Sequence, residues 1–219
     1  MPHSITVICG HYGCGKTNLA LNLALEAAKT GAPVTLADLD IVNPYFRSSD
    51  HRDLLAAHGV RLIAPVFAGT TLDTPTLPPA LASIFAPSSG QVFIDAGGGD
   101  AGVTALGGLA GRLLATGYRM LYVVNRYRAL SQTPAEAASL LEEIETASRL
   151  KATGLVNNSH LGVETTLPGL LAAVGFAKET ARLTSLPLLF STAPDFALNG
   201  QPPPKGFRTV RRLVRFAWE

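Results

Sequence analysis

The chain is poor in cysteine, in charge and in long apolar runs, and each shortage excludes a class of protein. Only two cysteines occur, Cys9 and Cys14, so a disulfide framework or a four-cysteine metal site within one chain is excluded. Charged residues make up 16% of the chain and the net charge is +2, which gives no strong nucleic-acid signal. No apolar run approaches the roughly eighteen residues that a transmembrane helix needs.

The compartment follows from the same shortages. Both cysteines lie close together near the start of the sequence, which is typical of a protein in the reducing cytoplasm. The first four residues lead directly into an apolar segment, so we expect no signal peptide. Hydrophobic residues make up 47% of the 219-residue chain, a composition typical of a folded domain with a large core. The sequence therefore predicts a cytoplasmic globular protein.

A glycine-rich segment near the start carries the strongest chemical signal. Gly10, Gly15, Lys16 and Thr17 fit the pattern G-x-x-x-x-G-K-[ST], between an apolar strand and a helix. In this motif backbone N–H groups surround phosphates, the lysine reaches the β and γ phosphates, and the Thr hydroxyl ligates Mg²⁺. The alternative is a glycine turn that binds nothing, which the flanking strand and helix disfavour. The predicted nucleotide-binding residues here are Gly10, His11, Tyr12, Gly13, Cys14, Gly15, Lys16, Thr17 and Asn18.

Apolar strands alternate with helices along the chain, which predicts an α/β fold. Because the strands are apolar throughout, the sheet is expected to be mostly parallel, with helices on both faces in three α/β/α layers. About seven strands are expected, over 5–9, 34–38, 60–66, 91–95, 118–124, 153–156 and 186–190. Helices are expected over 18–29, 50–58, 78–86, 104–116, 133–150 and 165–180, the last interrupted by Pro168 and Gly169. Ligands of such sheets bind beyond the carboxyl ends of the strands.

Asp95 ends one of these strands and is followed by Gly98. A carboxylate at this position can hold Mg²⁺ through water, and a glycine N–H can bind the γ-phosphate. The alternative is a strand-end Asp that caps the following turn, which would be the favoured interpretation without a phosphate loop nearby. With that loop present, we predict that Asp95 is a metal residue and that Gly98 contacts nucleotide.

Asp38 and Asp40 follow another strand. Residues two apart in an extended segment face the same side, so both carboxylates are predicted to act in catalysis, with Asp40 also near the metal. The alternative is one carboxylate that caps a turn and one that faces solvent.

Together these motifs resemble the MinD/ParA branch of P-loop ATPases, within the SIMIBI class. Relatives there are often labelled cobyrinic acid a,c-diamide synthase-like. The resemblance implies binding of ATP and Mg²⁺, slow hydrolysis, and an ATP-dependent homodimer or binding of a protein partner, which the sequence does not identify. It implies that Asp40 positions water and that Asp95 lies behind Mg²⁺. Lys16, which the loop motif assigns to phosphate, is predicted to be catalytic together with Asp38 and Asp40. The resemblance also implies that Asn157, Pro194 and Asp195 hold the adenine. Relatives specific for guanine carry Lys-x-Asp after the asparagine, whereas this chain has Asn158 and Ser159 there, which favours adenine over guanine.

One position departs from the resemblance. The branch usually has a lysine at the second position of its loop, where this chain has His11. A neutral imidazole cannot replace a permanent cation. Arg47, Arg126 or Arg128 are alternative sources of the charge, although ordinary solvated surface is the favoured interpretation of these arginines.

The last nineteen residues are basic. Residues 1–200 are expected to form the P-loop ATPase domain, and 201–219 a proline-rich connector and a basic amphipathic helix of the same domain. Such a helix can make a peripheral contact with the inner membrane face through 205–219. The favoured alternative is a last helix docked on the sheet.

The function that these features favour is a slowly hydrolysing, ATP-binding switch. Two alternatives remain open: a small-molecule kinase or ATP-dependent ligase, with 45–47 or 68–77 lining an acceptor pocket, and a membrane-recruited adaptor.

Overall fold

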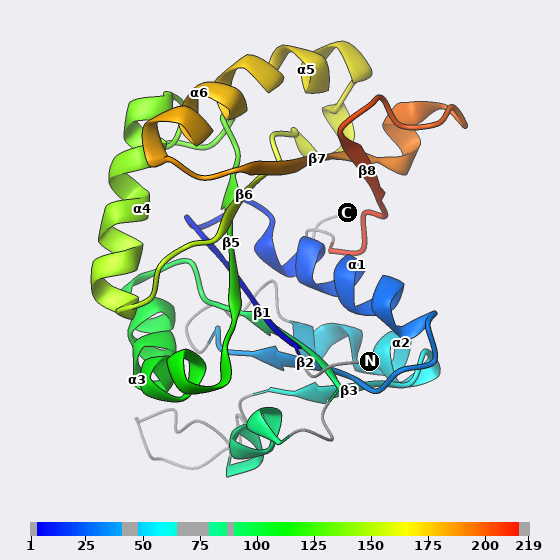
Figure 1. The fold of residues 1–219 in the computed structure, drawn as a ribbon. Helices are drawn as coiled ribbons and strands as arrows, with labels where there is room; N and C mark the ends of the chain where they lie inside the picture. The colour runs from blue at the N-terminus through cyan, green and yellow to red at the C-terminus, as the bar shows by residue number, and fades with distance from the viewer. Residues whose placement is uncertain (1–3, 41–47, 65–78, 87–89, 215–219) are drawn as a thin grey trace, which may run out of the picture.

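The structure is a computed structural model that describes residues 4–40, 48–64, 79–86 and 90–214. It has one sheet of eight parallel strands, in the order β3-β2-β4-β1-β5-β6-β7-β8 (Figure 1). The strands are β1 (Ser4–Gly10), β2 (Val34–Asp38), β3 (Val60–Ile63), β4 (Gln91–Asp95), β5 (Arg119–Val124), β6 (Gly154–Asn157), β7 (Leu188–Pro194) and β8 (Phe207–Val210). The prediction of a parallel α/β fold is confirmed, with one strand more than expected.

Helices cover both faces of this sheet because its central strands are apolar on both sides. One apolar core lies under α3 (Asp100–Thr116), α4 (Pro134–Ser148) and α6 (Val174–Thr184). The other lies under α1 (Lys16–Ala28) and α2 (Arg52–Ala57). The short α5 (Leu167–Ala172) belongs to a small third cluster beside the end of β7. Four 3₁₀ segments complete the described elements: η1 (Ser48–His51), η2 (Pro79–Phe85), η4 (Gly162–Glu164) and η5 (Asp195–Leu198).

Local capping signals account for several helix ends. Thr133 and Glu136 form a capping box at the start of α4, with Pro134 at the first helical position. The predicted helix over 165–180 is two helices, and Thr166 caps the first by accepting a hydrogen bond from the Gly169 N–H. The helix expected over 78–86 is the 3₁₀ segment η2. The strand expected over 60–66 ends at Ile63, and 65–66 lie outside the described residues.

The C-terminal segment differs most from its prediction. Phe207–Val210 is the edge strand β8, and 211–214 are not helical, so the amphipathic helix predicted for this region is wrong over these residues. The strand forms because it pairs in register with β7, from Ser191 opposite Phe207 to Pro194 opposite Val210. The membrane contact that this helix would have made therefore lacks its structural basis over 207–214.

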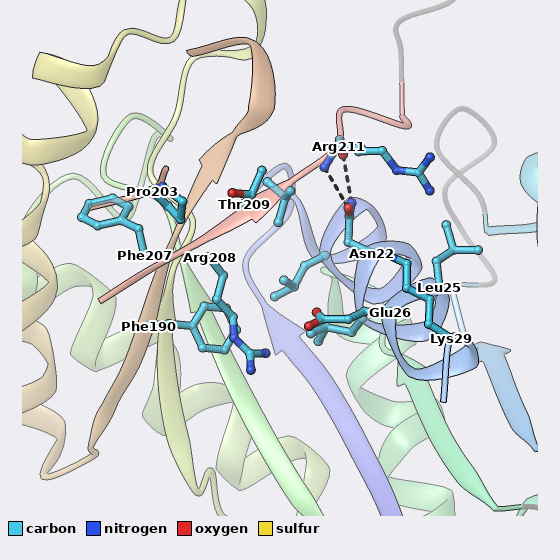
Figure 2. Close-up of a pocket in the computed structure, with 13 residues that line it drawn as sticks. Asn22, Leu25, Glu26, Lys29, Phe190, Pro203, Phe207, Arg208, Thr209 and Arg211 are labelled. Atoms are coloured by element: carbon cyan, nitrogen blue, oxygen red, sulfur yellow. Dashed lines mark hydrogen bonds between the residues drawn. The ribbon is translucent and has the colours of Figure 1, made fainter. Parts of the chain in front are cut away.

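After β8 the chain crosses α1 and is held there by two asparagine side chains. Asn22 donates to the Arg211 carbonyl (2.9 Å) and accepts from the Arg211 N–H (2.8 Å), and Figure 2 shows this pair. Asn18 donates to the same carbonyl (3.1 Å) and accepts from the N–H groups of Leu213 and Val214 (2.8 and 3.2 Å). This contact ties residues 211–214 to the helix that begins at the phosphate loop.

Several sequence predictions lie outside the described residues. They are Arg47 as a source of charge, the acceptor-pocket segments 45–47 and 68–77, and the last part of the predicted terminal helix, 215–219.

Candidate functional site

The glycine-rich segment 10–15 forms a tight loop between β1 and α1. Gly10, Gly13 and Gly15 have φ values of 150°, 73° and 87°, which side chains rarely permit. A Cβ at Gly10 would collide with the Val123 carbonyl oxygen, and one at Gly15 would collide with the Asn158 amide nitrogen. Gly15 is the N-cap of α1 and has no side chain to satisfy the first helical N–H groups. The loop therefore presents unsatisfied donors at a helix N-terminus, the arrangement that binds phosphate.

Asn158 fastens this loop to the sheet. Its Nδ2 donates to the Cys14 carbonyl at 2.7 Å, and its Oδ1 accepts from the Thr192 hydroxyl at 2.5 Å. The His160 Nε2 lies 3.2 Å from the same Oδ1. The sequence prediction used the preceding Asn157 and overlooked Asn158, although two successive asparagines at a strand end were the available signal. Asn158, which follows β6 and contacts Thr192 of β7, therefore fixes the position of the phosphate loop relative to these two strands.

Lys16 is buried against the loop that it follows. Its side chain is 7% exposed, and its Nζ donates to the His11 carbonyl at 3.0 Å. The loop after β4 lies directly on it, because a Cβ at Gly98 would come within 2.6 Å of the Lys16 Nζ and 2.7 Å of the Tyr12 Cα. The structure thus brings together the two loops that the sequence predicted to share one nucleotide.

Asp95 is 1% exposed and only half satisfied. Its Oδ2 accepts from the Ser48 hydroxyl at 3.2 Å, whereas its Oδ1 has no hydrogen-bond partner within the described residues. Burial raises the pKa of Asp95, against the opposing effects of the Lys16 charge and the Thr17 hydroxyl. An unpaired buried carboxylate oxygen is costly unless a cation or water completes it. The residues around it, Thr17 and Lys16, therefore fit a site for a hydrated cation bound together with phosphate.

Asp38 uses both carboxylate oxygens to hold the next turn. It accepts from the Asp40 N–H at 2.9 Å and from the Ser48 N–H at 3.0 Å. Burial raises its pKa, and the adjacent charge of Asp95, which is in register with it, adds to this increase. The geometry thus favours the capping interpretation for Asp38. The predicted catalytic role stays a prediction.

Asp40 lies on the other side of the same turn. A Cβ at Gly97 would come within 3.2 Å of the Asp40 Oδ1, so this carboxylate contacts the loop that follows Asp95. Asp40 is half-buried, and its negative charge contributes to the raised pKa of Asp95. Asp40 therefore lies against the loop that follows Asp95, whereas the side chain of Asp38 is engaged within its own turn. The predicted catalytic role of Asp40 stays a prediction.

The residues predicted to hold the adenine lie at the ends of β6 and β7. Asn157 donates to the Ser191 hydroxyl at 3.0 Å and accepts from the Ser159 N–H at 3.3 Å, so its amide is engaged on both sides. Pro194 is buried at the end of β7, and Asp195 is exposed and accepts from the Phe196 N–H at 2.8 Å. Asn18, also predicted to bind nucleotide, instead directs its amide to 211–214.

The loops at this edge carry positive charge and buried imidazole and thiol groups. Burial, together with the charges of Arg128 and Arg212, lowers the pKa of His160 to about 4. Burial and the Lys16 charge lower the pKa of His11, so this imidazole is neutral at neutral pH. Both cysteines are unpaired and buried, and burial raises the pKa of the Cys14 thiol. Burial thus disfavours the reactive thiolate form of the Cys14 thiol in this loop.

Large apolar side chains are exposed on the same loops. Tyr12 is 53% exposed in the phosphate loop, Leu130 65% in the loop after β5, and Val163 63% in the segment after β6. Two further exposed side chains there are Leu161 and Phe196. Exposed apolar side chains gathered at one end of a sheet are typical of a surface that binds a partner.

A hollow of about 480 Å³ lies between α1 and β8, away from the phosphate loop (Figure 2). The Arg208 guanidinium stacks on the Phe190 ring at 4.8 Å, and Glu26 and Lys29 line the α1 side. No residue predicted from the sequence to bind nucleotide or metal lines it. Across the described residues there is no group of three or more His, Cys, Asp and Glu side chains able to hold a metal. Among the same residues, no helix has the length and apolar character to span a membrane.

Comparison with known proteins places the fold and leaves the family open. No protein-family model and no curated protein matches the chain. The signal recognition particle 54 kDa protein of Aeropyrum pernix K1, in complex with GDP, matches with a TM-score of 0.56 and 16% identity over 86% of this chain and 41% of that chain. The cell division protein FtsY of Thermotoga maritima matches with a TM-score of 0.56 and 19% identity over 88% of this chain and 62% of that chain.

A third match is chloroplast FtsY of Physcomitrella patens, with a TM-score of 0.56 and 16% identity over 86% of this chain and 57% of that chain. This chain therefore spans between 41% and 62% of the length of these three solved structures. Likeness at such low identity shows the shared fold, the three-layer P-loop NTPase fold that the sequence predicted.

Proposed function

We propose that this protein is an ATP-binding, slowly hydrolysing P-loop ATPase that acts as a nucleotide-dependent switch of the MinD/ParA type. The observation that carries the proposal is the buried Asp95 beside Thr17 and Lys16 at the phosphate loop, whose Oδ1 has no hydrogen-bond partner in the part of the chain that the structure describes. This arrangement is costly in the free protein and is relieved when a hydrated cation and phosphate are bound.

The chain's residues take distinct roles in this proposal. The N–H groups of the loop and the Lys16 ammonium bind phosphate, and Thr17 with Asp95 holds Mg²⁺, Asp95 through water. When bound, Mg²⁺ neutralises negative charge on the phosphates. Asp40 accepts a hydrogen bond from a water whose oxygen attacks the γ-phosphorus. The bond from that phosphorus to the bridging oxygen breaks, ADP leaves with the electron pair, and the proton passes to solvent with the phosphate.

The choice of ATP over GTP rests on the sequence after β6. Asn157 is followed by Asn158 and Ser159, without the Lys-x-Asp of guanine-specific relatives. The matching signal recognition particle structure holds GDP, so the fold accommodates guanine in that protein. Competition between Mg²⁺–ATP and Mg²⁺–GTP for this chain tests the choice directly.

The switch is supported by the exposed apolar side chains around the same loops, Tyr12, Leu130 and Val163 among them. Because Gly98 lies against Lys16, a γ-phosphate that moves the loop after β4 also moves the adjoining surface. A protein partner, or a second copy of this chain, that docks on this edge would then distinguish ATP from ADP.

The test begins with calorimetric titration of the wild-type chain with Mg²⁺–ATP, Mg²⁺–ADP and Mg²⁺–GTP. The rate of phosphate release and the molecular mass in solution are then measured with each nucleotide. We expect ATP to bind, Lys16→Ala to abolish binding, and Asp40→Ala to bind ATP but release phosphate at least about tenfold more slowly. A wild-type chain that binds none of the three nucleotides would show that the proposal is wrong. If the chain binds ATP but its molecular mass in solution and its partner binding are the same in every nucleotide state, the switch part of the proposal is wrong. The ATPase part would then still stand.

A further inference from the structure

Arg128 lies against the phosphate loop from the neighbouring strand. It belongs to the loop after β5, and a Cβ built on Gly13 would lie 3.5 Å from its Nε and 3.7 Å from its Cζ. The guanidinium group thus lies over the open side of Gly13, in the middle of the loop. The ion pairs of the described residues are Lys151 with Glu145 and Arg182 with Glu179, so no described carboxylate neutralises Arg128.

The turn that presents Arg128 is held by a dense set of hydrogen bonds. The buried Asn125 accepts from the Tyr127 N–H through its side chain (3.0 Å) and from the Arg128 N–H through its carbonyl (3.1 Å). Ser131 closes the turn, because its hydroxyl donates to the Asn125 carbonyl at 3.0 Å and its N–H to the Arg128 carbonyl at 3.2 Å. A cation on such a backbone needs little reorganisation to act on a bound ligand.

Arg126 and His11, which the sequence also offered as candidates at this edge, are engaged elsewhere or neutral. The Arg126 Nη1 donates to the Ala172 carbonyl at 3.2 Å, and its guanidinium lies 5.7 Å from the Tyr127 ring centre. His11 is neutral at neutral pH because burial and the Lys16 charge lower its pKa. Of these three residues, Arg128 is the one that carries a permanent charge against the phosphate loop, beside Lys16.

We propose that Arg128 stabilises the phosphates of the nucleotide bound by its own chain, and with them the negative charge that develops as the terminal phosphate leaves. This inference rests on the proposed nucleotide site and adds a residue to it. In hydrolysis the bond between the γ-phosphorus and the bridging oxygen breaks, and the electron pair stays on that oxygen as ADP forms. A guanidinium is always protonated and offers several donors in one plane, which suits phosphate oxygens.

The experiment compares Arg128→Ala and Arg128→Lys with wild type, and uses Arg126→Ala as the matched control on the same loop. For each chain the dissociation constants of Mg²⁺–ATP and Mg²⁺–ADP and the rate of phosphate release are measured, together with thermal unfolding. We expect Arg128→Ala to slow phosphate release about tenfold or more and to weaken ATP more than ADP. Arg128→Lys should recover part of both losses, whereas Arg126→Ala should stay within about twofold of wild type.

The outcomes separate this inference from the proposed function. If wild type binds neither nucleotide, the proposed function fails and this inference fails with it. If wild type binds ATP but Arg128→Ala keeps both the release rate and the ATP/ADP affinity ratio within about twofold, only the role of Arg128 is overturned. If mixing Arg128→Ala with Lys16→Ala restores phosphate release, the arginine acts across two chains, and the own-chain assignment is wrong.

Discussion

The Asn22 side-chain amide pairs with both main-chain polar groups of Arg211, as a neighbouring strand would. Its Oδ1 accepts from the Arg211 N–H at 2.8 Å, and its Nδ2 donates to the Arg211 carbonyl at 2.9 Å. Arg211 directly follows the edge strand β8, so no further strand of the described residues pairs with its backbone. The Asn22 side chain of α1 makes the two hydrogen bonds that such a strand would make. Together with Asn18 it fixes 211–214 beside the start of the helix that carries Thr17.

Replacing Asn22 by Leu should lower the free energy of unfolding by about 1–3 kcal/mol, because two hydrogen bonds to one backbone residue are lost. Urea unfolding measures this change. Asn22→Asp keeps the acceptor for the Arg211 N–H and loses the donor, so its loss should be smaller. Equal stability of wild type and Asn22→Leu would show that the two Asn22 hydrogen bonds to Arg211 contribute nothing to the fold.

The two successive asparagines after β6 should have separable effects. Asn158→Ala removes the hydrogen bond to the Cys14 carbonyl and should weaken ATP and GTP alike, by about tenfold, because the whole loop loses its support. Asn157→Ala should instead alter the ratio of the ATP and GTP affinities if this residue contacts the base. Competition titrations with both nucleotides give both numbers, and a base-specific effect of Asn158→Ala would contradict this division.

Asp95→Asn should change stability and binding in opposite directions. The amide has nearly the shape of the carboxylate but carries no charge, so the nucleotide-free variant should equal wild type in stability or exceed it by about 1 kcal/mol. Stabilisation by Mg²⁺–ATP should fall strongly because the cation loses a negatively charged neighbour. Thermal unfolding with and without Mg²⁺–ATP measures both effects. A nucleotide-free variant less stable than wild type by more than about 2 kcal/mol would show that Asp95 is a structural residue.

His160 should make the protein sensitive to mild acid. Its pKa is lowered from 6.5 to about 4, so between these values the unfolded chain binds a proton that the native chain does not. Its contribution to stability is therefore complete above about pH 6.5 and is lost as the pH falls toward 4, by at most about 3 kcal/mol.

The measurement is urea unfolding of wild type and His160→Gln at several pH values. Asp38 and Asp95, whose pKa values are raised, act with the opposite sign in the same range but are present in both proteins, so the difference isolates His160. Parallel pH dependence of the two proteins would contradict the burial of a neutral imidazole.

Short-range patterns in the sequence account for what was predicted correctly. The alternation of apolar strands and helices gave the parallel sheet, and Thr133, Pro134 and Glu136 fixed the start of α4. The spacing of Gly10, Gly15 and Lys16 defined the phosphate loop, and the strand end at Asp95 placed the second loop beside it. In each case the signal lies within a few neighbouring residues.

The features that were missed depend on residues far apart in the chain. The pattern of Phe207–Val210 suits a helix or an edge strand, and only pairing with β7 decides between them. The support of the loop by Asn158 joins residues 144 positions apart, and the Ser48 contact to Asp95 joins residues 47 apart. The capping role of Asp38, which the sequence analysis weighed as the alternative, likewise depends on the return of the chain at Ser48. No local propensity encodes such contacts.

The attachment of 211–214 to α1 also has a consequence for synthesis. The Asn22 amide is made early, and its partner Arg211 follows 189 residues later. While those 189 residues are being made, a ribosome-bound chain therefore carries the phosphate loop and its helix with the two asparagine amides open to solvent. Contacts of such large sequence separation form late in folding. In a nascent chain, Asn18 and Asn22 should accordingly form their hydrogen bonds to 211–214 only after residues 207–214 have emerged. A chain cut before residue 207 should leave these two asparagine side chains of α1 exposed.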